Sequence, residues 1–130
     1  MKSRFLFILY CFILFTQGCT SDHVKKIGGG YFYRDEGGDI KDILCEKLNG
    51  GEIPATVLDF AYDNKFIIAK QSPKFPQNIL YRKEYKYKTD ENVFYWIILK
   101  NDNITLGPLS MQEYMTMRSK YKIPDKLIVE

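Results

Sequence analysis

The fold is decided by the stretch VFYWIILKNDNITLGPLS, which runs from Val93 to Ser110. It contains the only tryptophan of the chain, Trp96, and the densest apolar run outside the N-terminus. A run of β-branched and aromatic residues bounded by Asn, Asp, Gly and Pro is typical of a strand. Residues 93–99 are apolar at every position, which indicates a strand buried on both faces and therefore central in a sheet. Asn101 to Asn103 then turn the chain, and residues 104–106 pair back before Gly107-Pro108 stops the strand.

A helix follows this strand pair directly. Ser110 and Glu113 have the spacing of a capping box, in which each side chain bonds the backbone of the other residue. The spacing predicts a helix from 111 to about 121, with Pro124 beyond its end. We expect the side that carries Met111, Tyr114, Met115 and Arg118 to pack on the sheet. Residues 126–129 are a candidate for a last edge strand.

The clearest hairpin lies upstream, in residues 55–61 and 65–71, with Tyr62-Asp63-Asn64 as its turn. Asp59 and Lys70 are positioned to pair across its two strands. Residues 31–34 predict a first strand. Residues 40–48 are ambiguous, because their apolar positions have helical spacing behind a possible N-cap at Asp39. We favour a strand there, since the tight-turn signal Asn49-Gly50-Gly51 follows at once.

These elements predict an α+β fold, namely an antiparallel β meander of five to seven strands with one C-terminal α-helix. The 130 residues suffice for one domain and are too few for two. We place that single domain at residues 31–130. Short connections imply that strands adjacent in sequence are adjacent in the sheet.

The N-terminus has the pattern of a signal peptide, which we assign to residues 1–18. Lys2 and Arg4 form a short basic region, and the apolar run 5–15 is too short for a bilayer, which takes ~20 residues. Thr16-Gln17-Gly18-Cys19 resembles the lipobox of bacterial lipoproteins, although Thr16 stands where Leu is usual. The motif implies cleavage between Gly18 and Cys19 and lipidation of Cys19. An ordinary secreted protein and a retained signal anchor are the alternatives.

The expected location is extracytoplasmic, at the bacterial cell membrane or the outer membrane, with the lipid anchor as the contact with the membrane. Residues 19–30 then form the lipidated cysteine and a flexible tether that ends in three glycines. The only histidine, His23, lies in this tether, where a solvated linker residue is the simplest interpretation.

Cysteine and charge counts exclude several classes of protein. Cys11 leaves with the leader and Cys19 is consumed by the lipid, so Cys45 has no partner for a disulfide. It is either a reactive thiol or a small buried hydrophobe, and we favour the second. Without the leader, 17 basic residues face 16 acidic ones, so charge gives no case for nucleic acid.

One segment, residues 74–88, is both basic and aromatic. It supplies a candidate binding patch for an envelope protein or a glycan, formed by Tyr81, Arg82, Lys83, Tyr85, Lys86, Tyr87 and Lys88. Aromatic rings beside cations can also contact nucleic acid, lipid headgroups or cell-wall polymer. The plain structural alternative is a twisted edge hairpin whose lysines prevent edge-to-edge pairing.

No catalytic set is recognisable in the sequence, so we do not expect an enzyme. The remaining candidate is a carboxylate pair, which would need two of Asp59, Asp63, Asp90 and Glu91 to converge in space. Methionine sulfur suits Cu(I), but Met1 lies in the leader and Met111, Met115 and Met117 occupy ordinary helix positions, so we expect no metal site and no cofactor.

The chain resembles a family of small, functionally uncharacterised bacterial lipoproteins. The resemblance rests on Ile53-Pro54-Ala55-Thr56-Val57, residues 60–63, Phe66-Ile67-Ile68-Ala69-Lys70-Gln71, Tyr95-Trp96-Ile97-Ile98 and Gly107-Pro108-Leu109, and it covers roughly residues 30–123. It implies a lipoprotein with a single domain and carries no catalytic residues.

Two functions fit these features. The first is a lipid-anchored, non-catalytic binding module of the cell envelope, monomeric and facing another envelope protein or glycan. The second is an inhibitor or immunity-type lipoprotein that neutralises an envelope toxin or hydrolase. An inhibitor needs a compact exposed hot spot fitted to an enzyme.

Overall fold

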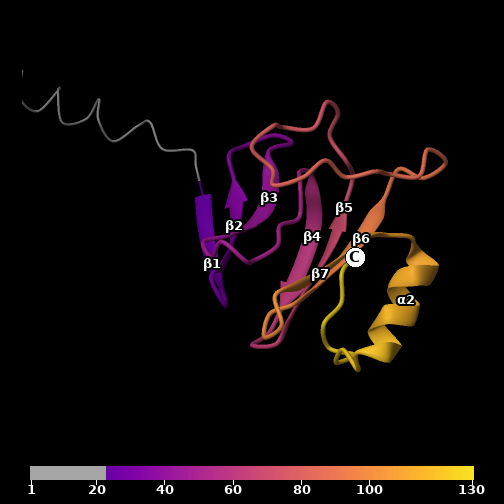
Figure 1. Ribbon diagram of the computed structural model, residues 1–130. Coiled ribbons are helices and arrows are strands. Elements are labelled where there is room, and N and C mark those ends of the chain that lie inside the picture. The colour runs from indigo at the N-terminus through magenta and orange to yellow at the C-terminus, as the bar shows by residue number, and fades with distance from the viewer. Residues whose placement is uncertain (1–22) are drawn as a thin grey trace, which may run out of the picture.

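The computed structural model describes residues 23–130, which form two antiparallel sheets and one helix (Figure 1). The signal peptide, the cleavage site at Gly18 and the lipidated Cys19 lie outside the described residues. Seven strands and one C-terminal helix confirm the predicted α+β class. The meander is divided, because three strands form one sheet and four form the other. No helix in the described part is long and apolar enough to cross a bilayer.

The first sheet has the order β1-β2-β3, with β1 at His23–Gly28, β2 at Tyr31–Asp35 and β3 at Lys41–Cys45. The ambiguous residues 40–48 therefore contain a strand, as favoured from the sequence. The flexible tether predicted for residues 19–30 is wrong from His23 onward, since β1 pairs with β2 along its length.

The correction has a physical reason. Only Ile27 of β1 is buried, so the strand shows none of the apolar alternation from which strands are recognised. Its place is fixed by backbone hydrogen bonds, which any composition can supply. Gly28, Gly29 and Gly30 all have positive φ angles (92°, 66° and 87°) and form the tight turn between β1 and β2.

The second sheet has the order β4-β5-β6-β7. Its strands are β4 at Val57–Tyr62, β5 at Phe66–Gln71, β6 at Phe94–Leu99 and β7 at Ile104–Leu109. Every residue of β6 is buried, Trp96 included, which confirms the central strand predicted from the opening stretch. The predicted stop at Gly107-Pro108 is wrong. β7 is an edge strand, where the missing N–H of a proline is tolerated.

The two sheets and the helix form three layers (Figure 1). On one face of the second sheet, Trp96 and Ile98 pack with Ile27, Tyr31 and Ile43 of the first sheet. The opposite face packs against the helix, α2, at Met111–Lys120. Because β6 lies between two apolar layers, it needs apolar residues at every position.

The helix begins with the predicted capping box of Ser110 and Glu113. Its buried side differs from the prediction, since Met111 and Met115 are 53% and 54% exposed. Tyr114 is the residue that packs, with its ring stacked on Tyr95 at 4.7 Å between centroids. Met117 and Tyr121 continue this face one and two turns later, so the apolar stripe is rotated from the expected one.

The C-terminal residues form no strand, so the candidate edge strand at 126–129 is wrong. Leu127 is buried in the helix layer instead. Asp59 and Lys70 lie opposite each other, as the hairpin predicted. Both contact Glu130, whose backbone N–H donates to Asp59 Oδ2 (2.7 Å) and whose carbonyl accepts from Lys70 Nζ (3.3 Å).

Candidate functional site

A long connection, residues 72–93, joins β5 to β6 and contains the predicted patch. It forms no strand, so the edge hairpin considered from the sequence is absent from it. Three tyrosines turn their hydroxyls inward, where Tyr81 donates to Asp42 (2.6 Å) and Tyr85 donates to Glu52 (2.8 Å). Tyr87 accepts from the Gln71 amide (3.0 Å). Burial raises the pKa of all three tyrosines, so they remain protonated at neutral pH.

Arg82 holds the long connection to the first sheet. Its guanidinium donates to four backbone carbonyls in and just after β3, those of Cys45, Lys47, Leu48 and Gly50. A planar group with five donors in a fixed fork suits such a set of carbonyls. This side chain is therefore occupied within the protein.

The lysines of the predicted patch, unlike the tyrosine hydroxyls, reach the solvent. Lys83, Lys86 and Lys88 are exposed. Lys83 lies over the Tyr85 ring at 5.2 Å, and Lys88 pairs with Glu113 of the helix at 3.3 Å. The structure thus separates the predicted residues into Arg82 and three tyrosines, which bond within the protein, and three exposed lysines, of which Lys83 also lines a pocket.

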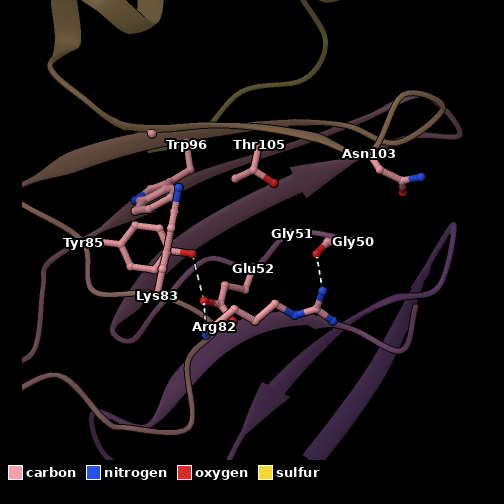
Figure 2. A pocket seen from close by; sticks show the side chains of 10 residues that line it. Gly50, Gly51, Glu52, Arg82, Lys83, Tyr85, Trp96, Asn103 and Thr105 are labelled. Atoms are coloured by element: carbon pink, nitrogen blue, oxygen red, sulfur yellow. Dashed lines mark hydrogen bonds between the residues drawn. The ribbon is translucent and has the colours of Figure 1, made fainter. Parts of the chain in front are cut away.

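A pocket of about 290 Å³ lies where the two sheets and the long connection meet, and we call it the inter-sheet pocket (Figure 2). Four segments line it: the β3–β4 connection, the long connection, β6 and the β6–β7 hairpin. The lining residues are Gly50, Gly51, Glu52, Arg82, Lys83, Tyr85, Trp96, Asn103, Thr105 and Gly107.

Two glycines give the pocket its shape through close backbone approach. A Cβ atom on Gly51 would lie 1.7 Å from Thr105 Oγ1, and one on Gly107 would lie 2.4 Å from the Trp96 ring. Side chains at these positions would displace the threonine and the indole. The glycines therefore allow both groups to reach the pocket wall.

Glu52 supplies a buried carboxylate to this pocket, being only 3% exposed. Its Oε2 atom accepts from the Arg82 backbone N–H (2.7 Å) and from the Tyr85 hydroxyl (2.8 Å). Burial, and then this hydrogen bond, raise the pKa of Tyr85. The phenol of Tyr85 also meets the Trp96 indole edge to face, with centroids 5.2 Å apart.

Two polar atoms of the pocket lining are buried without a partner among the described residues. They are Asn103 Oδ1 and Thr105 Oγ1, which come from the same hairpin. In Figure 2 both side chains project from the β6–β7 hairpin, opposite Glu52 and Arg82. A buried polar group without a hydrogen bond costs about 1–3 kcal/mol. Such atoms call for a water or a ligand that donates hydrogen bonds.

Two of the four carboxylates named from the sequence, Asp59 and Asp63, are engaged elsewhere. Asp63 accepts from the N–H groups of Lys65 and Phe66 in the β4–β5 turn, and Asp59 binds Glu130. Within residues 23–130, no group of three His, Cys, Asp or Glu side chains is arranged for a metal ion. His23 is exposed at the start of β1. The buried carboxylates are Asp42 and Glu52, which sequence reasoning did not single out.

Cys45 is buried and free. A Cβ atom on Gly50 would lie 2.2 Å from its Sγ atom, so the thiol packs closely against the backbone. Of the two interpretations given to this residue, its surroundings match the small buried hydrophobe.

Comparison with known families gave one match. The family model described as "Protein of unknown function (DUF3997)" matches residues 30–130. Neither the curated proteins nor the solved structures gave a match. The matched region covers nearly the same residues as the resemblance noted from the sequence, and both concern a family without an assigned function.

Proposed function

The chain belongs to the family of proteins of unknown function whose model matches residues 30–130, and on this basis we propose that it is a lipid-anchored, non-catalytic binding module of the bacterial cell envelope. Its ligand enters the inter-sheet pocket. The observation that carries this proposal is the pair of buried acceptors without partners, Asn103 Oδ1 and Thr105 Oγ1. Two buried polar atoms without hydrogen bonds lower the stability of the fold, and a ligand that donates hydrogen bonds to them best explains why they are there.

The chemistry of the lining narrows the ligand. Glu52, Asn103 and Thr105 offer oxygen acceptors, and the rings of Tyr85 and Trp96 form an aromatic wall. A cluster of hydroxyl and amide N–H donors fits this set, because it would donate to the oxygens and lie against the rings. A bare ammonium fits less well, since Lys83 of the same lining already places its ammonium over the Tyr85 ring. N-acetylated amino sugars and peptides, both components of envelope polymers, have the required donors.

An inhibitor or immunity function receives less support. Inhibitors present a compact, exposed hot spot. The tyrosines that were candidates for one use their hydroxyls internally, on Asp42, Glu52 and Gln71. The non-catalytic part of the proposal rests on the same network, because the buried carboxylates already accept hydrogen bonds from Arg34, Arg82 and tyrosines.

Trp96 fluorescence tests the pocket, since this only tryptophan lines it. The probes are N-acetylglucosamine, its β-1,4-linked dimer and a peptidoglycan fragment. We expect at least one to change the emission saturably and Thr105→Val to weaken its binding at least tenfold. Thr116→Val, on the exposed helix surface, is the matched control and should leave binding unchanged. Absence of binding by all probes, or equal binding by Thr105→Val, would overturn the assignment of the pocket.

The lipid anchor has its own test, which is independent of the pocket. The full chain is labelled in growing bacteria with a palmitate analogue. We expect wild type and Cys45→Ala to incorporate the label and Cys19→Ala to lose it. Equal labelling of Cys19→Ala, or no labelling of wild type, would rule out the anchor.

A further inference from the structure

The long connection presents an apolar tip, which we define as residues 75–80. Phe75, Ile79 and Leu80 are 70%, 95% and 76% exposed. Hydrogen bonds brace this tip: Asn78 Oδ1 accepts from the Leu80 N–H (2.9 Å), and Gln77 Nε2 donates to the Lys83 carbonyl (2.7 Å). A fixed turn that holds three large apolar side chains in solvent is a feature that an interaction surface explains.

The tip lies at the end of the first sheet where β1 begins and β2 ends. Ile79 lines a second pocket, of about 400 Å³, together with Arg34 and Glu36 at the end of β2. Arg34 is paired with Val24 of β1, and Asp35 with His23. The apolar tip is therefore at the end where β1 begins. In Figure 1 the chain enters β1 on the side along which the long connection runs.

This position matters because little chain separates it from the proposed anchor. Four residue steps lead from Cys19 to His23, and a fully extended chain covers at most about 14 Å in that number of steps. The start of β1 is thus held within about 14 Å of the lipid attachment. The apolar tip, at the same end, is held near the membrane surface.

We propose that the apolar tip inserts into the interfacial region of the membrane to which Cys19 anchors the chain, and so fixes the orientation of the domain. This inference rests on the lipid anchor of the proposed function. The cations beside the tip have acidic partners within the protein, since Lys74 binds Asp39 (3.1 Å) and Arg34 binds Glu36 (3.3 Å) and Asp42 (2.7 Å). The contact is therefore apolar rather than electrostatic, and it adds to the lipid chains as a second membrane contact.

The orientation has a consequence for the inter-sheet pocket. The turn after β3 lies at the opposite end of the first sheet, where the Glu46 N–H donates to the Gly30 carbonyl (2.8 Å). Gly50 and Gly51 of the pocket lining follow this turn. With the apolar tip in the membrane, the Gly50–Gly51 side of the pocket faces away from the lipid surface, and the side formed by Arg82 and Lys83, which directly follow the tip, lies nearer to it.

A fluorophore that responds to polarity tests the insertion. The full chain is purified with its lipid and reconstituted into vesicles of phosphatidylethanolamine and phosphatidylglycerol. Ile79→Cys carries the label, and Leu48→Cys is the matched control, because Leu48 is 98% exposed and lies at the opposite end. Cys45 is buried and stays unlabelled. We expect the emission at residue 79 to shift to shorter wavelength and to be quenched by brominated lipid, while that at residue 48 matches the label in water.

Each other outcome is decisive. If mass spectrometry shows an acylated chain and the label at residue 79 still reports water, the membrane contact is wrong and the anchor stands. If mass spectrometry shows a chain without acylation, both the lipid anchor and the membrane contact of the apolar tip are wrong. A shift at residue 79 that requires added envelope protein would assign the apolar tip to a protein partner and overturn the membrane contact.

Discussion

Thr105 lines the inter-sheet pocket, and its hydroxyl is buried without a hydrogen-bond partner among the described residues. A valine has nearly the same shape and no polar atom to desolvate. We expect Thr105→Val to leave the free energy of unfolding unchanged or to raise it by up to about 1 kcal/mol. Urea denaturation measures this change, with Thr116→Val as the control. A loss of more than about 1 kcal/mol would mean that the hydroxyl has a partner within the fold.

Tyr85 links stability to pH, because burial and the hydrogen bond to Glu52 raise its pKa. Above pH ~10 the unfolded tyrosine loses its proton while the folded one keeps it, so stability falls as pH rises. We expect Tyr85→Phe to be less stable by about 1–3 kcal/mol at neutral pH, since Glu52 loses a donor.

The wild-type and Tyr85→Phe stabilities should converge above pH ~10, at up to about 1.4 kcal/mol per pH unit. Urea denaturation at a series of alkaline pH values measures both curves. Parallel curves would show that Tyr85 ionises equally in both states. Tyr87→Phe is a useful comparison, because its hydroxyl accepts from Gln71 instead of donating to a carboxylate.

Residues of the pocket differ in how far the sequence could indicate them. Arg82, Lys83 and Tyr85 were in the predicted patch because a basic, aromatic run is visible in one segment. Asn103 and Thr105 looked like ordinary turn and strand residues. Their place in the pocket depends on Gly51, from a segment about fifty residues earlier, coming close to Thr105, and no local pattern encodes that approach.

At the level of elements, β1 is the part that the sequence hid. Removing it would take Ile27 out of the core cluster that contains Tyr31. It would also leave Lys100 without the Ile27 carbonyl to which its ammonium donates. We expect a chain begun at Gly29 to lose at least about 3 kcal/mol of stability, as for the loss of a large core side chain. A chain begun at His23 should match one begun at Thr20. Equal stability of the three chains, begun at Thr20, His23 and Gly29, would show that β1 adds nothing to the fold, as the predicted flexible tether requires.

The elements that were predicted correctly share one property: their signal is local. β6 is apolar at every position, the β4–β5 hairpin has its turn residues, and α2 has its capping box. The long connection was misjudged because its aromatic residues resemble a strand. Its tyrosine hydroxyls instead bond Asp42 and Glu52, which are distant in sequence.

In the whole molecule, the two sheets share one core, and this implies cooperative unfolding. Trp96 lies in the cluster formed by both sheets. The Lys100 ammonium, whose pKa is lowered by burial, donates to the carbonyls of Ile27 and Asp63 and so connects β1 with the β4–β5 turn. We expect Trp96 fluorescence and far-UV circular dichroism to give the same urea midpoint. An earlier fluorescence midpoint would show that the sheets separate first.

The division into two sheets could not be read from the sequence. The final helix and strands β2 to β7 follow from turns and apolar runs, which are local, whereas β1 was missed and a strand at 126–129 was wrongly expected. The break falls between β3 and β4, where Ile53 makes an isolated bridge to Ile43 and the chain passes to the next layer. Layer assignment depends on which apolar faces meet, and β6 has two apolar faces.

The four carbonyl contacts of Arg82 also bear on redox conditions. They join residue 82 to residues 45–50 and so close a loop of more than thirty residues, a task that small exported domains often give to a disulfide. Unlike a disulfide, the hydrogen bonds of a guanidinium are not broken by thiols and need no oxidant to form. Among residues 23–130 the one thiol, Cys45, is buried. The domain can therefore hold its longest connection in place equally well in a reducing cytoplasm and in an oxidising envelope.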